Sequence, residues 1–362
     1  MRSAAEFREN RKEKAEIGYR SGKKTPGGAG THTVPGDGAR STVVGRVCVR
    51  DTGFPFTGAV EFMSHFEVPD VPSPRTLPWS VHNRKELNTW RACHESMRIA
   101  AATYTPAVEQ HKPRLVLFGD SITESWRGTS YCKTMPRTRG VPGVLNSTLA
   151  KHWPSPLPLA ISADCTQHLL WRLQAGEFTP LMKNDPWLNV NLLIGTNNLG
   201  HGHSVGDTTR GILAVASYLL NATRTRLLIN ALLPRGDKRK RRHSRTASSG
   251  TSHYTDDVVA VNSALEKAVA SHLQRLYPSR VSYVDCGAPF YTQSPAKKST
   301  AADLGLAAAA SGAGPQAGIA PASTRPEIVR RDLMPDRLHP NAAGHELWGA
   351  CIVQALHNVG WV

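Results

Sequence analysis

Short apolar runs alternate with amphipathic stretches over roughly the last two-thirds of the sequence. The apolar runs are continuous, as is typical of strands buried on both faces of a parallel sheet. They are RLVLF (114–118), PLAI (158–161), VNLLIG (190–195), LLINALL (227–233) and VSYVD (281–285). Helical spacing is found at about 85–110, 166–176, 204–223, 256–277 and 341–359, the last with an apolar stripe from Leu347 to Val359. We therefore predict an α/β fold with three layers, α/β/α, around a five-stranded parallel sheet.

Other stretches do not fit this alternation and set the domain boundaries. Residues 1–40 are rich in Gly, Thr and charge, which predicts a disordered basic tail, and residues 41–84 predict an irregular N-terminal extension. Residues 85–362 are then predicted to form one domain with two low-complexity loop insertions. The insertions are a basic stretch at about 236–252 and an Ala/Gly/Ser/Pro tract at 294–326.

The positive charge is concentrated in parts predicted to be unstructured. The chain has 44 Lys and Arg against 28 Asp and Glu, a net charge of +16. Residues 1–50 carry +6 (11 basic, 5 acidic) and residues 235–245 another +6 (7 basic, 1 acidic), which leaves +4 for the rest. This distribution argues against a nucleic-acid-binding face. The cluster 238–242 is interpreted as a solvated loop, with a nuclear address or contact with an anionic surface as the alternatives.

The cysteines and the N-terminus favour a cytoplasmic protein. No CxxC pair or zinc-type spacing occurs, so we expect buried free thiols in a reducing compartment and no metal. The cysteines are Cys48, Cys93, Cys132, Cys165, Cys286 and Cys351. The first residues lack the apolar stretch of a secretory signal, and no run of about 18 apolar residues predicts a transmembrane segment.

Three motifs at predicted strand ends carry candidate chemistry. Ser121 follows the first strand in GDSI, Asn197 follows the third in GTNN, and Asp336 and His339 lie in DRLHPN before the last helix. Each motif alone also fits ordinary capping or turn chemistry. Together, at the carboxyl edge of one parallel sheet, they predict a serine nucleophile, a histidine base with its carboxylate, and an amide that binds an oxyanion.

GDSI, GTNN and DRLHPNAAG resemble, in order, blocks I, III and V of the SGNH (GDSL-type) hydrolases. The stretches DCTQHLLWRLQAGEF (164–178), IGTNNLGHGHS (194–204) and LLPRGDK (232–238) look more specifically like the catalytic subunits of intracellular platelet-activating-factor acetylhydrolase. The resemblance spans about 113–356 apart from the insertions. It implies the flavodoxin-like sheet of the SGNH hydrolase fold and a serine esterase without a cofactor.

The resemblance also implies a role for each matched position. Ser121 becomes the nucleophile, His339 the base and Asp336 the carboxylate that orients it. The oxyanion hole consists of the Ser121 and Ala163 backbone N–H groups and the Asn197 side chain. Asp120, Asp164, Asn198 and Leu199 are expected to line the substrate site. The family usually has glycine where this chain has Ala163, so we expect a weakened oxyanion donor if that position needs a positive φ.

These observations predict a serine esterase that removes a short, acetyl-like group from a lipid, sugar or small ester through an acyl-enzyme. A homodimer is a further expectation from the resemblance. The alternatives are a catalytically weak binding module on the same fold, and a basic RNA- or membrane-associated protein. His201 and His203 form an H-x-H motif, but no acidic or cysteine partner at useful spacing supports a metal site.

Overall fold

The computed structural model describes residues 67–77, 80–106, 112–236, 254–292 and 329–362. The chain divides into two units, Met1–Glu61 and Phe62–Val362, and every described residue belongs to the second. The predicted tail (1–40), the first part of the extension, the insertion 294–326 and all but Gly236 of the insertion 236–252 lie outside the described residues, as does the basic cluster 238–242.

The described part is built on a parallel five-stranded sheet. Its order is β4-β1-β5-β6-β7, so the first strand lies between the second and third large strands of the chain. The strands are β1 (Arg114–Gly119), β4 (Leu157–Ala160), β5 (Leu188–Leu193), β6 (Arg226–Asn230) and β7 (Val281–Val284). The central strands are buried almost throughout, because both faces of the sheet are covered.

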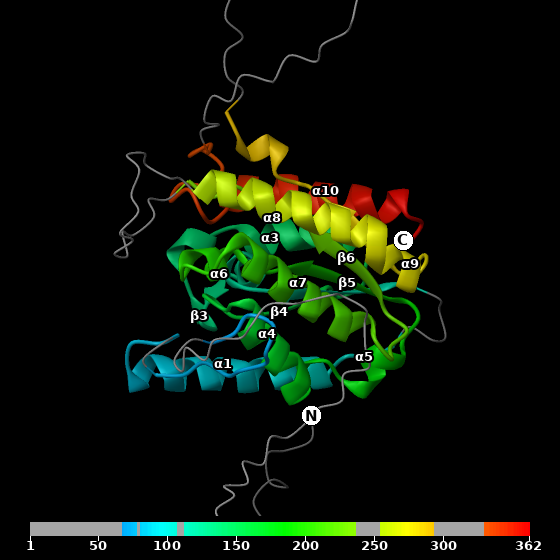
Figure 1. Ribbon diagram of the computed structural model, residues 1–362, viewed down its shortest axis with the longest axis horizontal. Coiled ribbons are helices and arrows are strands. Elements are labelled where there is room, and N and C mark those ends of the chain that lie inside the picture. Colours follow the sequence, from blue (N-terminus) through cyan, green and yellow to red (C-terminus); the bar gives the residue numbers. More distant parts are fainter. Residues whose placement is uncertain (1–66, 78–79, 107–111, 237–253, 293–328) are drawn as a thin grey trace, which may run out of the picture. The chain divides into compact units, whose positions relative to one another are not determined.

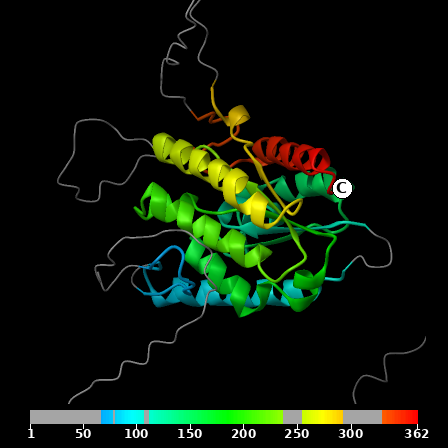
Figure 2. The same ribbon diagram turned by 45° about the vertical axis from the view of Figure 1, so that its right-hand side comes forward.

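Helices cover the sheet on both faces (Figures 1 and 2). On one face α3 (Val141–Ser147) packs beside α10 (Ala342–Asn358). On the other face lie α4 (Thr166–Arg172), α7 (Val205–Leu220) and α8 (Tyr254–Ala268), with α1 (Arg84–Ala102) next to β4. The predicted three-layer α/β/α architecture with a flavodoxin-like strand order is therefore confirmed.

Shorter elements complete the connections. They are α2 (Ser121–Glu124), α5 (Pro180–Asn184), α6 (Thr196–Gly200), α9 (Gln274–Leu276), the hairpin β2 (Thr129–Ser130) and β3 (Lys133–Thr134), the 3-10 turns η1 (Ser125–Arg127), η2 (Pro136–Thr138), η3 (Leu149–Lys151) and η6 (Ala288–Phe290), and the π-helical turns η4 (Leu173–Glu177) and η5 (Val269–Leu273). The two elements that matter most for the site are α2 and α6, because each begins directly after a strand.

Two helix predictions need correction. The first helix ends at Ala102 rather than near residue 110, because Thr103 closes it and Pro106 follows. In α10 the ends of the predicted stripe, Leu347 and Val359, are 39% and 37% exposed. Trp348, Ile352 and Leu356 of the predicted stripe are buried as expected, and two glycines and a histidine, which a stripe defined by apolar residues overlooks, are buried with them.

The prediction of free thiols is wrong for four of the five described cysteines. Cys93 on α1 is bonded to Cys132 between β2 and β3, and Cys286 after β7 is bonded to Cys351 on α10. The partners are 39 and 65 residues apart, so only the fold brings them together. Cys165 is free and buried. The cysteine argument for a reducing compartment therefore no longer holds, and the cytoplasmic location stays a prediction.

Among the helices in the described ranges, none combines the length and the apolar character that crossing a membrane requires.

Candidate active site

The turn after β1 presents Ser121. Gly119 ends the strand, and a Cβ there would lie 2.5 Å from the Leu193 carbonyl oxygen, so the strand can pass its neighbour only with glycine at this position. Asp120 is the N-cap of α2 and accepts a hydrogen bond from the Ile122 N–H at 3.0 Å. Ser121 is the first residue of the helix and is 5% exposed. The sequence thus folds into a tight strand-to-helix turn with the serine at the carboxyl edge of the sheet.

The segment before α10 brings a histidine to this serine. His339 Nε2 lies 2.9 Å from Ser121 Oγ, and His339 Nδ1 lies 2.7 Å from Asp336 Oδ2. An ionised carboxylate only accepts hydrogen bonds, so Nδ1 carries the proton and Nε2 is left to accept the serine proton. Although Ser121 and His339 are 218 positions apart in the sequence, the three residues predicted to be catalytic are hydrogen-bonded in one line.

Asp336 is fixed by its own loop. Besides the ring of His339, its carboxylate accepts the backbone N–H groups of Leu338 at 3.0 Å and His339 at 2.7 Å. Partial burial alone raises the pKa of Asp336, but these hydrogen bonds and the histidine charge outweigh it and hold the pKa well below its usual range. The carboxylate is therefore ionised at neutral pH, as orienting an imidazole requires.

Asp120 has a different environment although it is the neighbour of Ser121. Its side chain is fully buried, and its Oδ2 has no hydrogen-bond partner among the described residues. Burial raises the pKa of Asp120 to about 7, with the nearby Asp164 adding to the effect, while the Ile122 N–H opposes it. Asp120 therefore supports the nucleophile turn from within the protein and offers no exposed surface to a substrate.

The predicted oxyanion donors follow three neighbouring strands. Ser121 comes after β1, Ala163 comes after β4, and Asn197 is the second residue of α6 after β5. The Asn197 side-chain amide donates one hydrogen to the Asp164 carbonyl oxygen at 2.9 Å. An amide NH₂ carries two hydrogens, so the second remains for a ligand while the first fixes the orientation of the group.

Ala163 has a left-handed backbone, with φ at +61°. It occupies the third position of a turn that is closed by the Asp164 N–H and the Ile161 carbonyl oxygen at 3.3 Å. Turns with positive φ at this position favour glycine, because a Cβ there approaches the following carbonyl. The position does need a positive φ, and alanine adopts it.

Residues 117–347, more than half of the chain, match the GDSL-like lipase/acylhydrolase family. The chain belongs to that family. The superfamily resemblance carried by GDSI, GTNN and DRLHPN is thereby confirmed.

Two curated relatives of this GDSL-like protein are acetylhydrolase subunits. Platelet-activating factor acetylhydrolase IB subunit alpha1 of Bos taurus is 39% identical over 166 residues, which cover 45% of this chain and 59% of the relative. Subunit alpha2 of Homo sapiens is 31% identical over 83 residues, 23% of this chain and 34% of the relative. The chain thus matches less than two-thirds of the length of either relative.

A solved structure with a similar arrangement is a GDSL-like lipase from Bacteroides thetaiotaomicron. It is 14% identical, covers 73% of this chain and 97% of its own, and has a TM-score of 0.48. A likeness of this degree says nothing about the reaction or the substrate.

Three of the four residues that the family resemblance assigned to substrate binding point into the protein. Asp164, Asn198 and Leu199 are all buried. Asn198 accepts the Thr166 N–H at 3.0 Å, and Asp164 accepts hydrogen bonds from three side chains. Like Asp120, these side chains are buried and shape the loops that carry the donors, and their place at the substrate site stays a prediction.

Sequence reasoning missed the buried charges that hold this edge of the family fold. Arg172 on α4 is fully buried. Its Nε donates to Asp164 at 2.7 Å, a terminal nitrogen donates to the Gly119 carbonyl at 3.2 Å, and the other contacts Glu177. The guanidinium therefore ties the end of β1 to the turn after β4. In the sequence it stands among apolar residues in LLWRL, a pattern that fits burial and exposure equally well.

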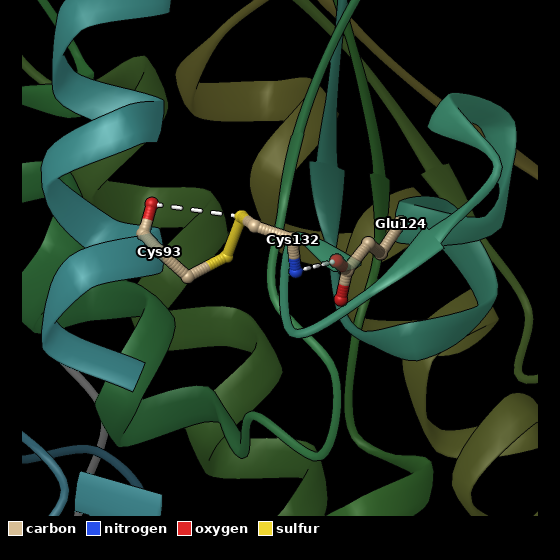
Figure 3. A group of neighbouring side chains, drawn as sticks. All are labelled: Cys93, Glu124 and Cys132. Atoms are coloured by element: carbon tan, nitrogen blue, oxygen red, sulfur yellow. Dashed lines mark hydrogen bonds between the residues drawn. A yellow bond between two sulfur atoms is a disulfide. The ribbon is translucent and has the colours of Figure 1, made fainter. Parts of the chain in front are cut away.

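One group of described residues has the composition of a metal site. Sulfur and oxygen atoms of Cys93, Cys132 and Glu124 lie within 4.8 Å of one another (Figure 3). The two sulfurs are joined in a disulfide, and both Glu124 oxygens accept hydrogen bonds, among them the Cys132 and Ser162 N–H groups at 2.7 and 2.6 Å. Neither a thiolate nor a free carboxylate is available, so this donor set does not fit a metal ion.

The H-x-H motif has partners within the protein. His201 Nδ1 lies 3.1 Å from the buried Cys165 sulfur, and His203 Nδ1 lies 3.3 Å from the Asn198 amide nitrogen. Burial lowers the pKa of His201 to about 4 and also lowers that of His203. Burial also raises the pKa of the Cys165 thiol, so this sulfur is a poor nucleophile.

Proposed function

We propose that this protein is a serine esterase that removes a short acyl group from an ester through an acyl-enzyme intermediate. The observation that carries the proposal is the unbroken line Ser121–His339–Asp336, with contacts of 2.9 and 2.7 Å at the carboxyl edge of the sheet. Membership of a family described as lipases and acylhydrolases supports it.

The reaction has two halves. In the first, Ser121 Oγ attacks the ester carbonyl carbon while His339 Nε2 takes its proton, and His339 then gives that proton to the departing alcohol oxygen. In the second, water attacks the acyl-enzyme by the same proton transfers, and the carboxylic acid is released. Asp336 keeps the imidazole in the tautomer that both halves need.

The negative charge that develops on the carbonyl oxygen needs donors fixed in advance. The proposed donors are the Ser121 and Ala163 N–H groups and the second amide hydrogen of Asn197. Donors held rigidly by the protein stabilise such charge without reorganising during the reaction, and one donor is worth about 10²–10³ in kcat. The Asn197 amide is pre-oriented by its bond to Asp164.

A short acyl group is the favoured substrate class. The methyl group of Ala163 stands where the family usually has only a hydrogen, and it narrows the space beside the oxyanion donor. The curated relatives are named acetylhydrolases, which agrees with an acetyl-sized group. We infer an acetyl or similarly small acyl chain, carried by a lipid, sugar or small alcohol. The homodimer stays a prediction.

The positive φ of Ala163 also favours the second candidate, a binding module that has lost most of its activity. The two candidates differ in one measurement. Purified protein is given p-nitrophenyl acetate, butyrate, octanoate and palmitate, and kcat/KM is measured for each. The esterase hypothesis expects turnover that is highest for acetate and falls with chain length. No turnover of any ester, together with no labelling of Ser121 by a fluorophosphonate, would favour the binding module instead.

A further inference from the structure

Arg75 lies outside the part of the chain that matches the family, yet it reaches the candidate oxyanion turn. Its side chain is 1% exposed. Nε donates to the Asp164 carboxylate at 3.1 Å, and a terminal nitrogen donates to the Ser162 carbonyl oxygen, also at 3.1 Å. These two acceptors belong to the residues immediately before and after Ala163. One planar guanidinium therefore bridges both sides of the residue with positive φ.

The remainder of the Arg75 side chain is anchored as well. Its other terminal nitrogen donates to the Tyr131 hydroxyl at 3.2 Å, and the guanidinium lies 5.6 Å from the centre of the Tyr131 ring. Tyr131 belongs to the segment whose backbone N–H groups bind Glu124. Glu124 in turn accepts the Ser162 N–H at 2.6 Å. The backbone of Ser162 is thus held from both its N–H and its carbonyl sides.

The turn needs such support because its sequence opposes its conformation. For alanine, the left-handed region is populated about ten-fold less than the ordinary backbone conformations. Glycine populates both about equally. Strained residues persist only where the surroundings fix them more firmly than the strain opposes. The bridge from Ser162 to Asp164 fixes Ala163 in this way.

We propose that Arg75 is a positioning residue for the candidate oxyanion hole: it holds the turn 161–164 in the conformation that aims the Ala163 N–H, and so compensates for the alanine at this position. This inference rests on the proposed esterase function. It assigns a task to the segment before α1, which lies outside the residues that match the family.

The test compares Arg75→Lys and Arg75→Met in two backgrounds, the natural chain and Ala163→Gly. Lysine keeps the charge but has no planar fork, so it cannot bridge the two acceptors in the same geometry. With Ala163 present, kcat on p-nitrophenyl acetate should fall about ten-fold or more in Arg75→Lys, with KM within two-fold. In the Ala163→Gly background, the same substitution should lower kcat less than three-fold, because glycine adopts the positive φ without help.

A purely structural arginine would behave differently. The fall in kcat would then be equal in both backgrounds, whatever the change in unfolding temperature, and this result would overturn the proposal. Arg98→Lys is the matched control, because Arg98 is an exposed arginine paired with Glu95 on α1, and it should leave kcat unchanged. If Arg75→Met does not fold, Arg75→Lys carries the kinetic comparison alone.

Hydrogen exchange separates this inference from the esterase function. Amide exchange over 161–166, measured by mass spectrometry, should be at least ten-fold faster in Arg75→Lys than in the natural chain and should change little in the Ala163→Gly background. Unchanged exchange overturns the positioning role even in an active enzyme. An inactive natural protein with accelerated exchange in Arg75→Lys would instead refute the esterase function and retain the positioning role.

Discussion

The proposed catalytic line, Ser121–His339–Asp336, and the turn at Ala163 lie at the same edge of the sheet but are held in different ways. The line from Ser121 to Asp336 depends on two side-chain hydrogen bonds, and its outer end is 50% exposed. The turn at Ala163 is fixed by charged side chains inside the protein, with Asp164 and Arg172 wholly buried. The groups proposed to react can therefore be removed with little effect on folding, whereas the groups that shape their surroundings cannot.

The largest effect is expected at Ser121. Ser121→Ala should lower kcat by about 10⁴-fold or more, because the loss of a triad nucleophile leaves only the oxyanion donors and substrate binding. The unfolding temperature should not change, since the hydroxyl contributes little packing. Ser96→Ala, an exposed serine on α1, serves as the control. Activity above about a hundredth of wild type would refute the assignment of the nucleophile.

The next largest effect on kcat is expected at Asp336, the carboxylate that orients His339. Asp336→Asn should lower kcat by about 10³–10⁴-fold with little change in KM, because the amide favours the wrong imidazole tautomer at unchanged shape. The comparison uses initial rates from pH 5 to 9, over which the natural Asp336 stays ionised because its pKa is depressed. Asp332→Asn, an exposed neighbour, is the control. Equal rates in mutant and wild type would contradict the role of Asp336.

The supporting network should show the opposite pattern, a loss of stability. Arg172→Met leaves the Asp164 and Glu177 carboxylates buried without this partner, and we expect the free energy of unfolding to fall by about 3–5 kcal/mol. Urea unfolding measures it, and Arg98→Met on the surface is the control. A fall in unfolding free energy of less than about 1 kcal/mol would show that the buried charges at the Ala163 turn matter no more for stability than the proposed catalytic residues do.

The contribution of Asp120 to the free energy of unfolding should depend on pH. Its pKa is about 7 in the folded protein against 3.8 for an ordinary aspartate, so the folded state binds this proton more tightly. The associated stability is fully present below about pH 4 and is lost as pH rises to about 7. Asp120→Asn cannot lose a proton, so its unfolding free energy relative to wild type should rise between pH 4.5 and 8. A difference that is constant over this range would show that Asp120 is ionised normally.

The smallest effect is expected for Ala163→Gly in the otherwise natural chain. Relief of the left-handed strain contributes about 1–2 kcal/mol, and the greater freedom of glycine in the unfolded chain offsets about 0.5–1 kcal/mol of it. Because Arg75 already fixes the turn, kcat should change less than three-fold. A ten-fold rise would mean that the alanine distorts the hole. A wider range of accepted acyl chains would agree with the loss of the methyl group.

The elements, and the meeting of Ser121, His339 and Asp336 at one edge of the sheet, were predictable because their signals are local. Continuous apolar runs mark each strand, and GDSI and DRLHPN each place their side chain within a few residues of a strand or helix end. Arg75 and Arg172 were not predictable in the same way. Their acceptors belong to loops that only the fold brings near, and an arginine surrounded by apolar residues fits a surface position equally well on sequence alone.

Contacts between residues far apart in the sequence also explain the other features that the sequence did not predict. The disulfide partners are separated by whole elements, so their spacing contains no signal. Ala163 was recognised as a departure from the family pattern, but its positive φ depends on the turn that Glu124 and Arg75 enforce. His345 on α10 is fully buried, with its ring nitrogens near the Ile122 and Asn341 carbonyl oxygens, and both of these contacts depend on the fold.

The disulfide between Cys286 and Cys351 makes the chain from one to the other a covalent ring. The long Ala/Gly/Ser/Pro tract and the proposed catalytic residues Asp336 and His339 all lie inside that ring. A protease that cut one peptide bond in the tract would yield two fragments that remain covalently joined by the disulfide. Without a reductant, the two fragments would therefore migrate as one band in electrophoresis. With a reductant, the fragment that carries His339 would separate from the one that carries Ser121, so the bridge decides whether such a cut divides the two halves of the candidate site.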